Sequence, residues 1–184
     1  MEHRDTAALE AGLDDIRRSP RDHGRLALVV RRPAVDEREV LDEGVLDPAE
    51  GLVGDTWNVR GSSRTPDGSS HPDMQLNVMN ARLARLIAGD VARWGLAGDQ
   101  LYVDFDLSEA SCPPGTRLSI GSAVIEITEQ PHTGCAKFAA RFGRDALHFV
   151  NSPVGRELRL RGVNARVVTG GAVRPGDEIE RLPA

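Results

Sequence analysis

The feature that most constrains the fold is a series of short strand-like runs in the second half of the chain. Glycine and proline interrupt these runs repeatedly, as in Pro113-Pro114-Gly115, Gly170-Gly171 and Pro175-Gly176-Asp177. Such residues favour turns because they fix or free the backbone where a chain reverses. Strands are expected at 101–105, 116–120, 123–128, 157–161, 165–169 and 177–181. Together with the strands expected earlier in the chain, this spacing predicts a mainly β protein with a closed or nearly closed barrel and two or three short helices.

The first half of the chain supplies the remaining strands. Residues 25–32 form an apolar run that ends at Pro33, and their continuous hydrophobicity predicts a strand buried on both faces. A weaker strand is expected at 39–45. Residues 74–78 alternate between apolar and polar, which predicts a strand with Gln75 and Asn77 on its polar face. Asn80 then has the position of a helix N-cap, with Gly89 ending that helix.

Length and composition limit the class of protein. A chain of 184 residues fits one domain, which we expect at 25–184, preceded by a charged segment at 1–24 with a short amphipathic helix. The formal net charge of −5 disfavours a general nucleic-acid-binding protein. No apolar run approaches the roughly 20 residues that a membrane helix needs. With only two cysteines, the composition fits a reducing compartment, and the cytoplasm is the expected location.

The chemically most informative stretch is 130–144, where Cys135 stands at the expected start of a helix. Lys137, Arg141 and Arg144 have the spacing of one helical stripe, while Phe138 and Phe142 form an apolar stripe beside it. A cysteine at a helix N-terminus near cations favours the thiolate, and the same cations can receive a phosphate. A small buried hydrophobe is the alternative role for Cys135, because free cysteine is among the most buried residue types.

Other candidates are less specific. The segment 51–57 passes through two glycines and places Asp55 at its end, and the polar loop at 58–73 is compatible with either a lid or a surface excursion. His132 precedes Cys135 by three residues, which leaves open a transferase with His132 as base. Cys112 adjoins two prolines and has no expected role. Phosphate-loop, dinucleotide, zinc-hydrolase and nucleophile-elbow motifs are absent from the sequence.

In combination these segments resemble the MOSC domain family, named for the C-terminal part of molybdenum-cofactor sulfurases. Four features carry the resemblance, and they lie in the expected order between about residues 25 and 181. They are Gly51-Leu52-Val53-Gly54-Asp55; the Gln75 strand followed by a helix; Pro114-Gly115-Thr116-Arg117-Leu118-Ser119-Ile120-Gly121 leading into the run at 123–128; and Cys135 with Lys137-Phe138 and Arg141-Phe142-Gly143. The last feature resembles stand-alone bacterial members.

The resemblance implies a strand-rich barrel whose cysteine carries a persulfide or ligates the molybdenum of the pterin cofactor (molybdopterin). For this chain it implies Cys135 as the catalytic or metal-ligating residue. The other residues that the resemblance implies around the cofactor are Asp55, Gln75, Asn77, Asn80, His132, Thr133, Lys137, Arg141 and Arg144. It further implies a pterin or other small-molecule ligand and a cysteine desulfurase or redox partner, with no nucleic acid or membrane. Pyridoxal phosphate would act only through that desulfurase.

The chain departs from the family pattern at two places. Gly134 replaces the usual proline before the cysteine, and this replacement is expected to loosen the turn. The acidic run at 101–106 stands where the mitochondrial amidoxime-reducing members have Arg and Asn, and it is expected to weaken retention of the cofactor phosphate. A sulfurtransferase, a molybdenum-dependent oxidoreductase, and a non-catalytic binding or detoxification module for a small anionic or N-hydroxylated compound all remain compatible with the sequence.

Overall fold

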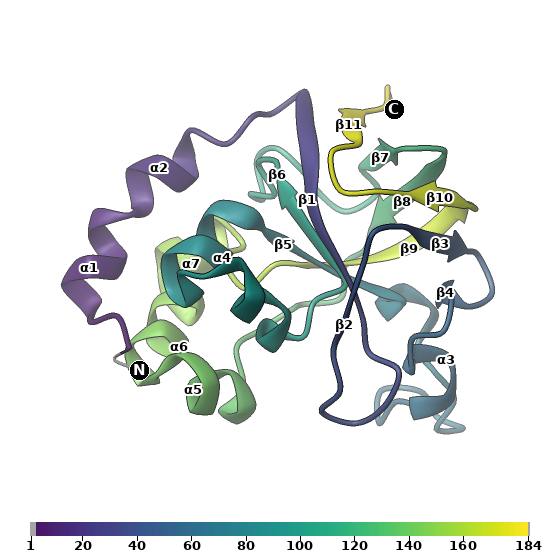
Figure 1. Ribbon diagram of the computed structural model, residues 1–184, viewed down its shortest axis with the longest axis horizontal. Helices are drawn as coiled ribbons and strands as arrows, with labels where there is room; N and C mark the ends of the chain where they lie inside the picture. The colour runs from purple at the N-terminus through teal and green to yellow at the C-terminus, as the bar shows by residue number, and fades with distance from the viewer. Residues whose placement is uncertain (1–2, 184) are drawn as a thin grey trace.

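The computed structural model describes residues 3–183, and its centre is a closed barrel of seven strands (Figure 1). The hydrogen-bonded order around the barrel is β11-β7-β8-β9-β5-β6-β1, and β1 closes it by pairing with β11 through His23 opposite Glu180. Neighbouring strands are antiparallel except for β5 and β6. The barrel strands are β1 (His23–Arg31), β5 (Leu76–Asn80), β6 (Leu101–Asp104), β7 (Arg117–Ile120), β8 (Ala123–Ile127), β9 (Val163–Thr169) and β11 (Glu178–Arg181).

A smaller sheet and the helices surround the barrel. β2 (Glu39–Leu41) extends the sheet from the far end of β1, and β10 (Gly171–Val173), β3 (Gly44–Asp47) and β4 (Gly51–Leu52) form a second sheet. The α-helices are α1 (Thr6–Ala11), α2 (Leu13–Arg17), α3 (Trp57–Arg60), α4 (Ala81–Ala88), α5 (Ala136–Phe142), α6 (Arg144–Asn151) and α7 (Pro153–Glu157). Two 3₁₀ segments, η1 (Pro72–Met74) and η2 (Val91–Ala97), complete the described chain. All the α-helices except α3 gather on one side of the barrel (Figure 1).

The central strands have continuous apolar runs because both of their faces are buried. On β6, Leu101 and Val103 point into the barrel cluster, whereas Tyr102 belongs to the cluster between barrel and helices. On β5, Val78 faces the interior and Met79 the helices, and all five β5 residues are buried. The predicted alternation is present, with Leu76 and Val78 in the barrel core, but the polar side chain of Asn77 is buried. A covered sheet removes both faces from water and favours continuous apolar sequence.

Several sequence-based predictions of elements are confirmed. Asn80 caps α4, because its Oδ1 accepts hydrogen bonds from the backbone N–H groups of Arg82 and Leu83, and Gly89 ends that helix at a φ of 70°. On β8, Ala123, Ile125 and Ile127 are buried, as the alternation indicated. The expected N-terminal helix forms as α1 and α2, with Leu9 and Ile16 packed into the helix-side cluster.

Other predictions of elements were wrong. Residues 157–161 form the end of α7 and a turn instead of a strand, because Arg159 and Gly162 both adopt positive φ. Gly171 begins β10 instead of serving only as a turn. The helices are more numerous than the two or three expected. Among residues 3–183 no helix combines the length and apolar character needed to cross a membrane.

A buried ion pair closes the end of the barrel next to the β1–β2 loop. Arg32 donates to both carboxylate oxygens of Asp55, at 2.8 Å each, and their side chains are 7% and 0% exposed. Arg32 also donates to the side chain of Asn77 and the carbonyl of Gly98, so this charge is hydrogen-bonded as well as paired. Such pairing is required because an isolated buried charge is strongly destabilising.

This arrangement predicts a large difference between two neighbouring ion pairs. Asp55→Ala leaves the Arg32 guanidinium buried without its partner and is expected to lower the free energy of unfolding by about 3–5 kcal/mol. Glu39→Ala removes the partner of the adjacent Arg31, whose pair is half-exposed, and is expected to cost less than about 1 kcal/mol. Urea unfolding of both variants checks this, and equal losses would contradict the structural role assigned to Asp55.

Candidate functional site

Cys135 is the N-cap residue of α5, and its side chain is exposed. Its extended backbone (φ −126°, ψ 177°) stops the helix there, and its thiol makes no capping hydrogen bond. Phe138 and Phe142, 2% and 1% exposed, anchor the opposite face of α5 in the helix-side cluster. The predicted division of this helix into an apolar stripe and an accessible cysteine is therefore confirmed.

Cys112, the other cysteine, has the opposite environment. It is 0% exposed, and its Sγ lies 3.3 Å from the carbonyl oxygen of Asp106. Burial raises the pKa of the Cys112 thiol to about 12, with the Asp106 carboxylate as a second cause. Because the thiolate is the reactive form, Cys112 is chemically inert in the folded protein.

The turn before Cys135, which Gly134 was expected to loosen, is held by two hydrogen bonds with one side chain. The side chain of Asn151 accepts a hydrogen bond from the Gly134 N–H at 2.9 Å and donates one to the Gly134 carbonyl at 3.2 Å. A Cβ at position 134 would lie 2.7 Å from Leu147 and 2.9 Å from Val150. A larger residue at position 134 would therefore require the side chains of Leu147 and Val150 on α6 to shift.

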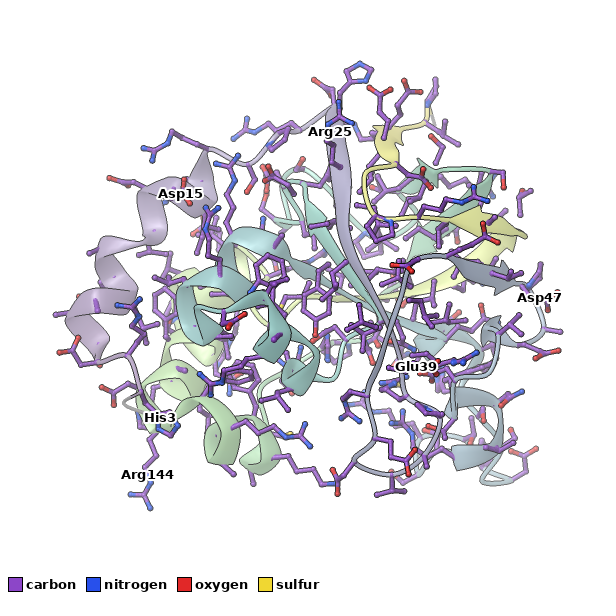
Figure 2. The ribbon with its side chains drawn as sticks, in the orientation of Figure 1. His3, Asp15, Arg25, Glu39, Asp47 and Arg144 are labelled. Atoms are coloured by element: carbon purple, nitrogen blue, oxygen red, sulfur yellow. The ribbon has the colours of Figure 1, made fainter. Side chains whose placement is uncertain are left out.

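The basic stripe is only partly continuous. Lys137 and Arg141 both reach Asp36 of the β1–β2 loop, at 3.6 Å and 2.9 Å, and Arg141 also donates to the Leu96 carbonyl. Arg144 does not continue the stripe, because Gly143 adopts a φ of 95° and α6 starts in a new direction. Figure 2 shows Arg144 projecting outward from the helical side of the molecule. The accessible group at this surface is therefore Cys135 with Lys137, Arg141 and Asp36, which we call the α5 face.

Four of the sequence-predicted residues lie in the hydrogen-bonded interior and have their polar groups occupied there. Asp55 binds Arg32, and Asn77 bridges Arg32 and Asn164. Gln75 donates to the Pro48 carbonyl and accepts from the Val167 N–H, while Asn80 donates to Ser19 and Phe105 besides capping α4. The structure thus does not bring these four side chains together with the Cys135 thiol at an open surface.

His132 and Thr133 line a cavity on the far side of the turn that precedes Cys135. The His132 side chain is 13% exposed, and its Nδ1 lies 3.6 Å from Asp99 Oδ1, which is too long for a hydrogen bond. Burial, reinforced by the positive charges of Arg161 and Arg32, holds the pKa of His132 well below its ordinary value. His132 therefore stays neutral at physiological pH.

Sequence reasoning missed the second buried ion pair, which supports α5. Arg161 donates to both oxygens of Asp99, at 2.9 Å and 2.7 Å, and its guanidinium lies 5.1 Å from the centre of the Phe138 ring. Asp99 is fully buried, and burial raises its pKa against the opposing effect of Arg161. An aspartate two residues before an apolar strand was the available signal, but Arg161 had been assigned to a strand that does not form.

A second chain of hydrogen bonds ties the barrel to the turn before Cys135. Asn77 donates to the Asn164 side chain at 2.7 Å, and Asn164 in turn donates to the Gln130 carbonyl at 3.0 Å. The Arg32–Asp55 pair is continuous with this chain through Asn77. We call these five residues the polar layer. It fixes the start of the segment 130–135 from inside the barrel.

The fold and site thus define a closed β-barrel that presents one accessible cysteine on a buttressed turn. A model of the MOSC domain family matches residues 69–180, and the chain belongs to that family. The family is associated in general with the molybdenum cofactor and with sulfur binding.

Solved structures of similar fold are related to the chain only distantly in sequence. The YuaD protein of Bacillus subtilis is 19% identical with a TM-score of 0.58, covering 86% of this chain and 95% of its own. YiiM of Escherichia coli is 21% identical with a TM-score of 0.55, covering 87% and 70%, and YiiM of Geobacillus stearothermophilus is 13% identical with a TM-score of 0.52, covering 87% and 73%. A comparison with curated proteins gave no match.

The two cysteines are predicted to differ sharply in alkylation. Iodoacetamide should modify Cys135 of the native protein at least about tenfold faster than Cys112, because only Cys135 is accessible and Cys112 stays protonated. Peptide mass spectrometry of time points measures both rates in one sample. In Cys135→Ser the fast reaction should disappear, and in Cys112→Ser it should remain. Comparable rates at both cysteines would contradict the assignment.

The lowered pKa of His132 predicts that the folded protein loses stability in mild acid. When the pH is below the ordinary pKa of histidine, the unfolded chain binds a proton at His132 that the folded protein does not bind. The free energy of unfolding therefore falls as the pH falls. The contribution is at most about 1.4 kcal/mol per pH unit, beginning near pH 6.5. Urea unfolding between pH 7 and 5 should give a flatter pH dependence for His132→Asn than for the wild type. Parallel curves would show that His132 titrates normally.

Proposed function

We propose that the protein is a sulfur carrier in which Cys135 holds a persulfide on the α5 face. The observation that supports this most is the contrast between an exposed thiol on a fixed turn and a second thiol that is sealed in the core. A persulfide carrier needs a sulfur atom that a donor protein can reach, and only Cys135 meets this condition in the described chain.

The loading step that we propose is a simple displacement. The Cys135 thiolate attacks the terminal sulfur of a persulfide on a donor such as a cysteine desulfurase. The bond between the two donor sulfurs breaks, Cys135 gains the terminal sulfur with its proton, and the donor leaves as a thiolate. No net oxidation occurs, because a new sulfur–sulfur bond to Cys135 forms as the donor's bond breaks, and the transferred sulfur keeps its oxidation state. Lys137, which is exposed on the same helix, would stabilise the anionic persulfide.

The residues of the α5 face also fit the cofactor associated with the family. A thiolate is a soft ligand suited to molybdenum, and Lys137 and Arg141 are cations that can pair with a phosphate. In this second role, Cys135 would ligate the metal and the two cations would hold the anionic end of the pterin. The bound cofactor would supply two-electron redox chemistry.

Asp36 opposes anion binding at this face, because it already pairs with both Lys137 and Arg141. An incoming phosphate must replace the carboxylate, so we propose that cofactor is bound transiently and not retained. The polar layer, including Asp55, Asn77 and Gln130, would serve as support beneath the site. Gln75 and Asn80 would support it more remotely, through strand β5. A carrier with a reduced thiol would work in a reducing compartment such as the cytoplasm.

Sulfur loading can be tested by cyanolysis, which releases persulfide sulfur as thiocyanate. After incubation with a cysteine desulfurase, cysteine and pyridoxal phosphate, wild-type protein and Cys112→Ser should each release about one thiocyanate per chain. Cys135→Ser should release none above background. Equal release of thiocyanate from Cys135→Ser and wild type would contradict the carrier proposal.

Molybdenum cofactor reconstitution separates the two roles of Cys135. If the thiol ligates the metal, Cys135→Ser should retain much less molybdenum than wild type, and Asp36→Asn should retain more because its competing carboxylate is gone. Persulfide loading without retained molybdenum would support the carrier alone. Ligand binding that survives Cys135→Ser but is lost in Arg141→Glu would favour the non-catalytic binding module.

A further inference from the structure

The loop between β1 and β2 is joined to α5 by side chains, at the lower end of the molecule (Figure 1). We call its residues 33–38 the strap. Asp36 Oδ1 lies 2.9 Å from Arg141 Nη2 and 3.6 Å from Lys137 Nζ. One carboxylate of the strap therefore binds two cations of the helix that carries the thiol at its start.

The strap has few other attachments to the rest of the protein. Within the described part of the chain, its backbone makes one hydrogen bond with another backbone group, and that bond is internal, from the Glu37 N–H to the Ala34 carbonyl. Its largest apolar side chain, Val35, is 80% exposed and so contributes little packing. Arg38 adds one hydrogen bond to the body, from its Nε to the Gly95 carbonyl at 3.0 Å. Polar contacts of two side chains thus hold the strap in place.

The end of η2 binds the strap and its neighbours in the same way but with different exposure. Four successive carbonyl groups there each accept a hydrogen bond from a different arginine, because the last carbonyls of a helix lack partners inside it. The pairs are Gly95 with Arg38, Leu96 with Arg141, Ala97 with Arg161, and Gly98 with Arg32. The last two arginines also pair with aspartates that are 0% exposed. Arg141 instead pairs with Asp36, whose side chain is 60% exposed.

This difference in exposure makes the strap the movable member of the group. An exposed ion pair shifts an equilibrium by a factor of about five at most, and salt weakens it further. A buried pair cannot separate without leaving a charge stranded in the interior. Opening the strap therefore breaks contacts at the surface only, whereas separating either buried pair would disrupt the end of the barrel.

The strap lies within the area that a protein docked on Cys135 would cover. Lys137 follows Cys135 by two residues, which places their Cα atoms at most about 8 Å apart. A specific interface covers about 800 Å² of each partner, which corresponds to a patch roughly 16 Å in radius. A donor protein centred on Cys135 must therefore cover Lys137 and meet the strap that is bound to it.

We propose that the strap is an autoinhibitory contact. Asp36 holds it closed on α5, and it must swing aside before a sulfur-donor protein can seat around Cys135. The opening of the strap involves no sulfur chemistry and can be measured by itself. Its effect on the loading of Cys135 rests on the carrier function proposed above.

Backbone ¹⁵N relaxation of the full chain tests the strap directly. Asp36→Asn removes the charge and keeps the turn, because asparagine shares the tolerance of aspartate for the left-handed backbone found there (φ 62°). At low salt, the order parameters of residues 34–38 should lie at about 0.85 in the wild type and below about 0.6 in Asp36→Asn. Glu37→Gln removes a neighbouring exposed charge and should match the wild type. At about 0.5 M NaCl, the wild type should approach Asp36→Asn. Equal order parameters in wild type and Asp36→Asn at low salt would overturn the proposal.

The initial rate of persulfide loading tests the inhibitory role. With a cysteine desulfurase, cysteine and pyridoxal phosphate at low salt, Asp36→Asn and Arg38→Gln should each load about two- to fivefold faster than the wild type, as judged by thiocyanate release. Arg38→Gln separates release of the strap from simple attraction of the donor, because loss of a cation from this face would slow the approach of an anionic protein. Iodoacetamide should alkylate Cys135 at the same rate in all three proteins, since so small a reagent does not need the strap to move.

The outcomes distinguish this inference from the carrier function itself. Loading at equal rates in the three proteins, with sulfur present on Cys135, would overturn the inhibitory role and leave the carrier proposal intact. Slower loading of Arg38→Gln, or faster alkylation of Cys135 in the variants, would also overturn it, because the effect would then come from charge or from the thiol. Absence of persulfide from all three proteins would overturn the carrier function and the inhibitory role together.

Discussion

The burial of two arginine–aspartate pairs at one end of the barrel is the constraint on which the rest of the structure depends. Arg32–Asp55 and Arg161–Asp99 are both almost fully removed from water. Charges in such positions are tolerated only with close partners and additional hydrogen bonds. These needs fix the neighbouring loops, because Gly98, Ala97 and Asn77 must lie where they can satisfy the guanidiniums. The loops around the Cys135 turn therefore have little freedom.

The consequence for function is a thiol that is exposed but held in place. Phe138 anchors α5 under Arg161, Asn151 holds Gly134, and Asn164 holds Gln130. Each of these contacts fixes backbone or helix while leaving the Cys135 side chain at the surface. Rigid support beneath an accessible reactive group is the usual arrangement for sites carried on loops.

Much of the barrel could be predicted from the sequence because local patterns determine it. The alternation of Ala123, Ile125 and Ile127, the cap at Asn80 and the glycine at 89 each act within a few residues. The apolar stripe of Phe138 and Phe142 followed from their helical spacing, whereas the residue types alone left open whether Cys135 is buried. The two ion pairs could not be predicted, because Arg161 meets Asp99 only through the closed barrel, 62 residues apart. The strand expected at 157–161 failed for a similar reason, since a turn is imposed there by packing against β5.

The polar residues in β5 and just before it illustrate the limit most clearly. Gln75 and Asn77 look like pocket residues in the sequence, yet they satisfy backbone and side-chain groups inside the fold. A polar side chain near a functional segment can support it without meeting the ligand. The accessible chemistry is reduced to one thiol with two cations and a competing aspartate.

The central claim is that Cys135 is the residue that carries the persulfide sulfur in the cell. The most direct measurement is mass spectrometry of peptides from protein purified anaerobically, without reductant, and blocked at once with an alkylating reagent. The account predicts a fraction of the peptide containing Cys135 that carries one additional sulfur atom, with the Cys112 peptide unmodified. An additional sulfur on Cys112, or on neither cysteine when a desulfurase is co-produced, would contradict it.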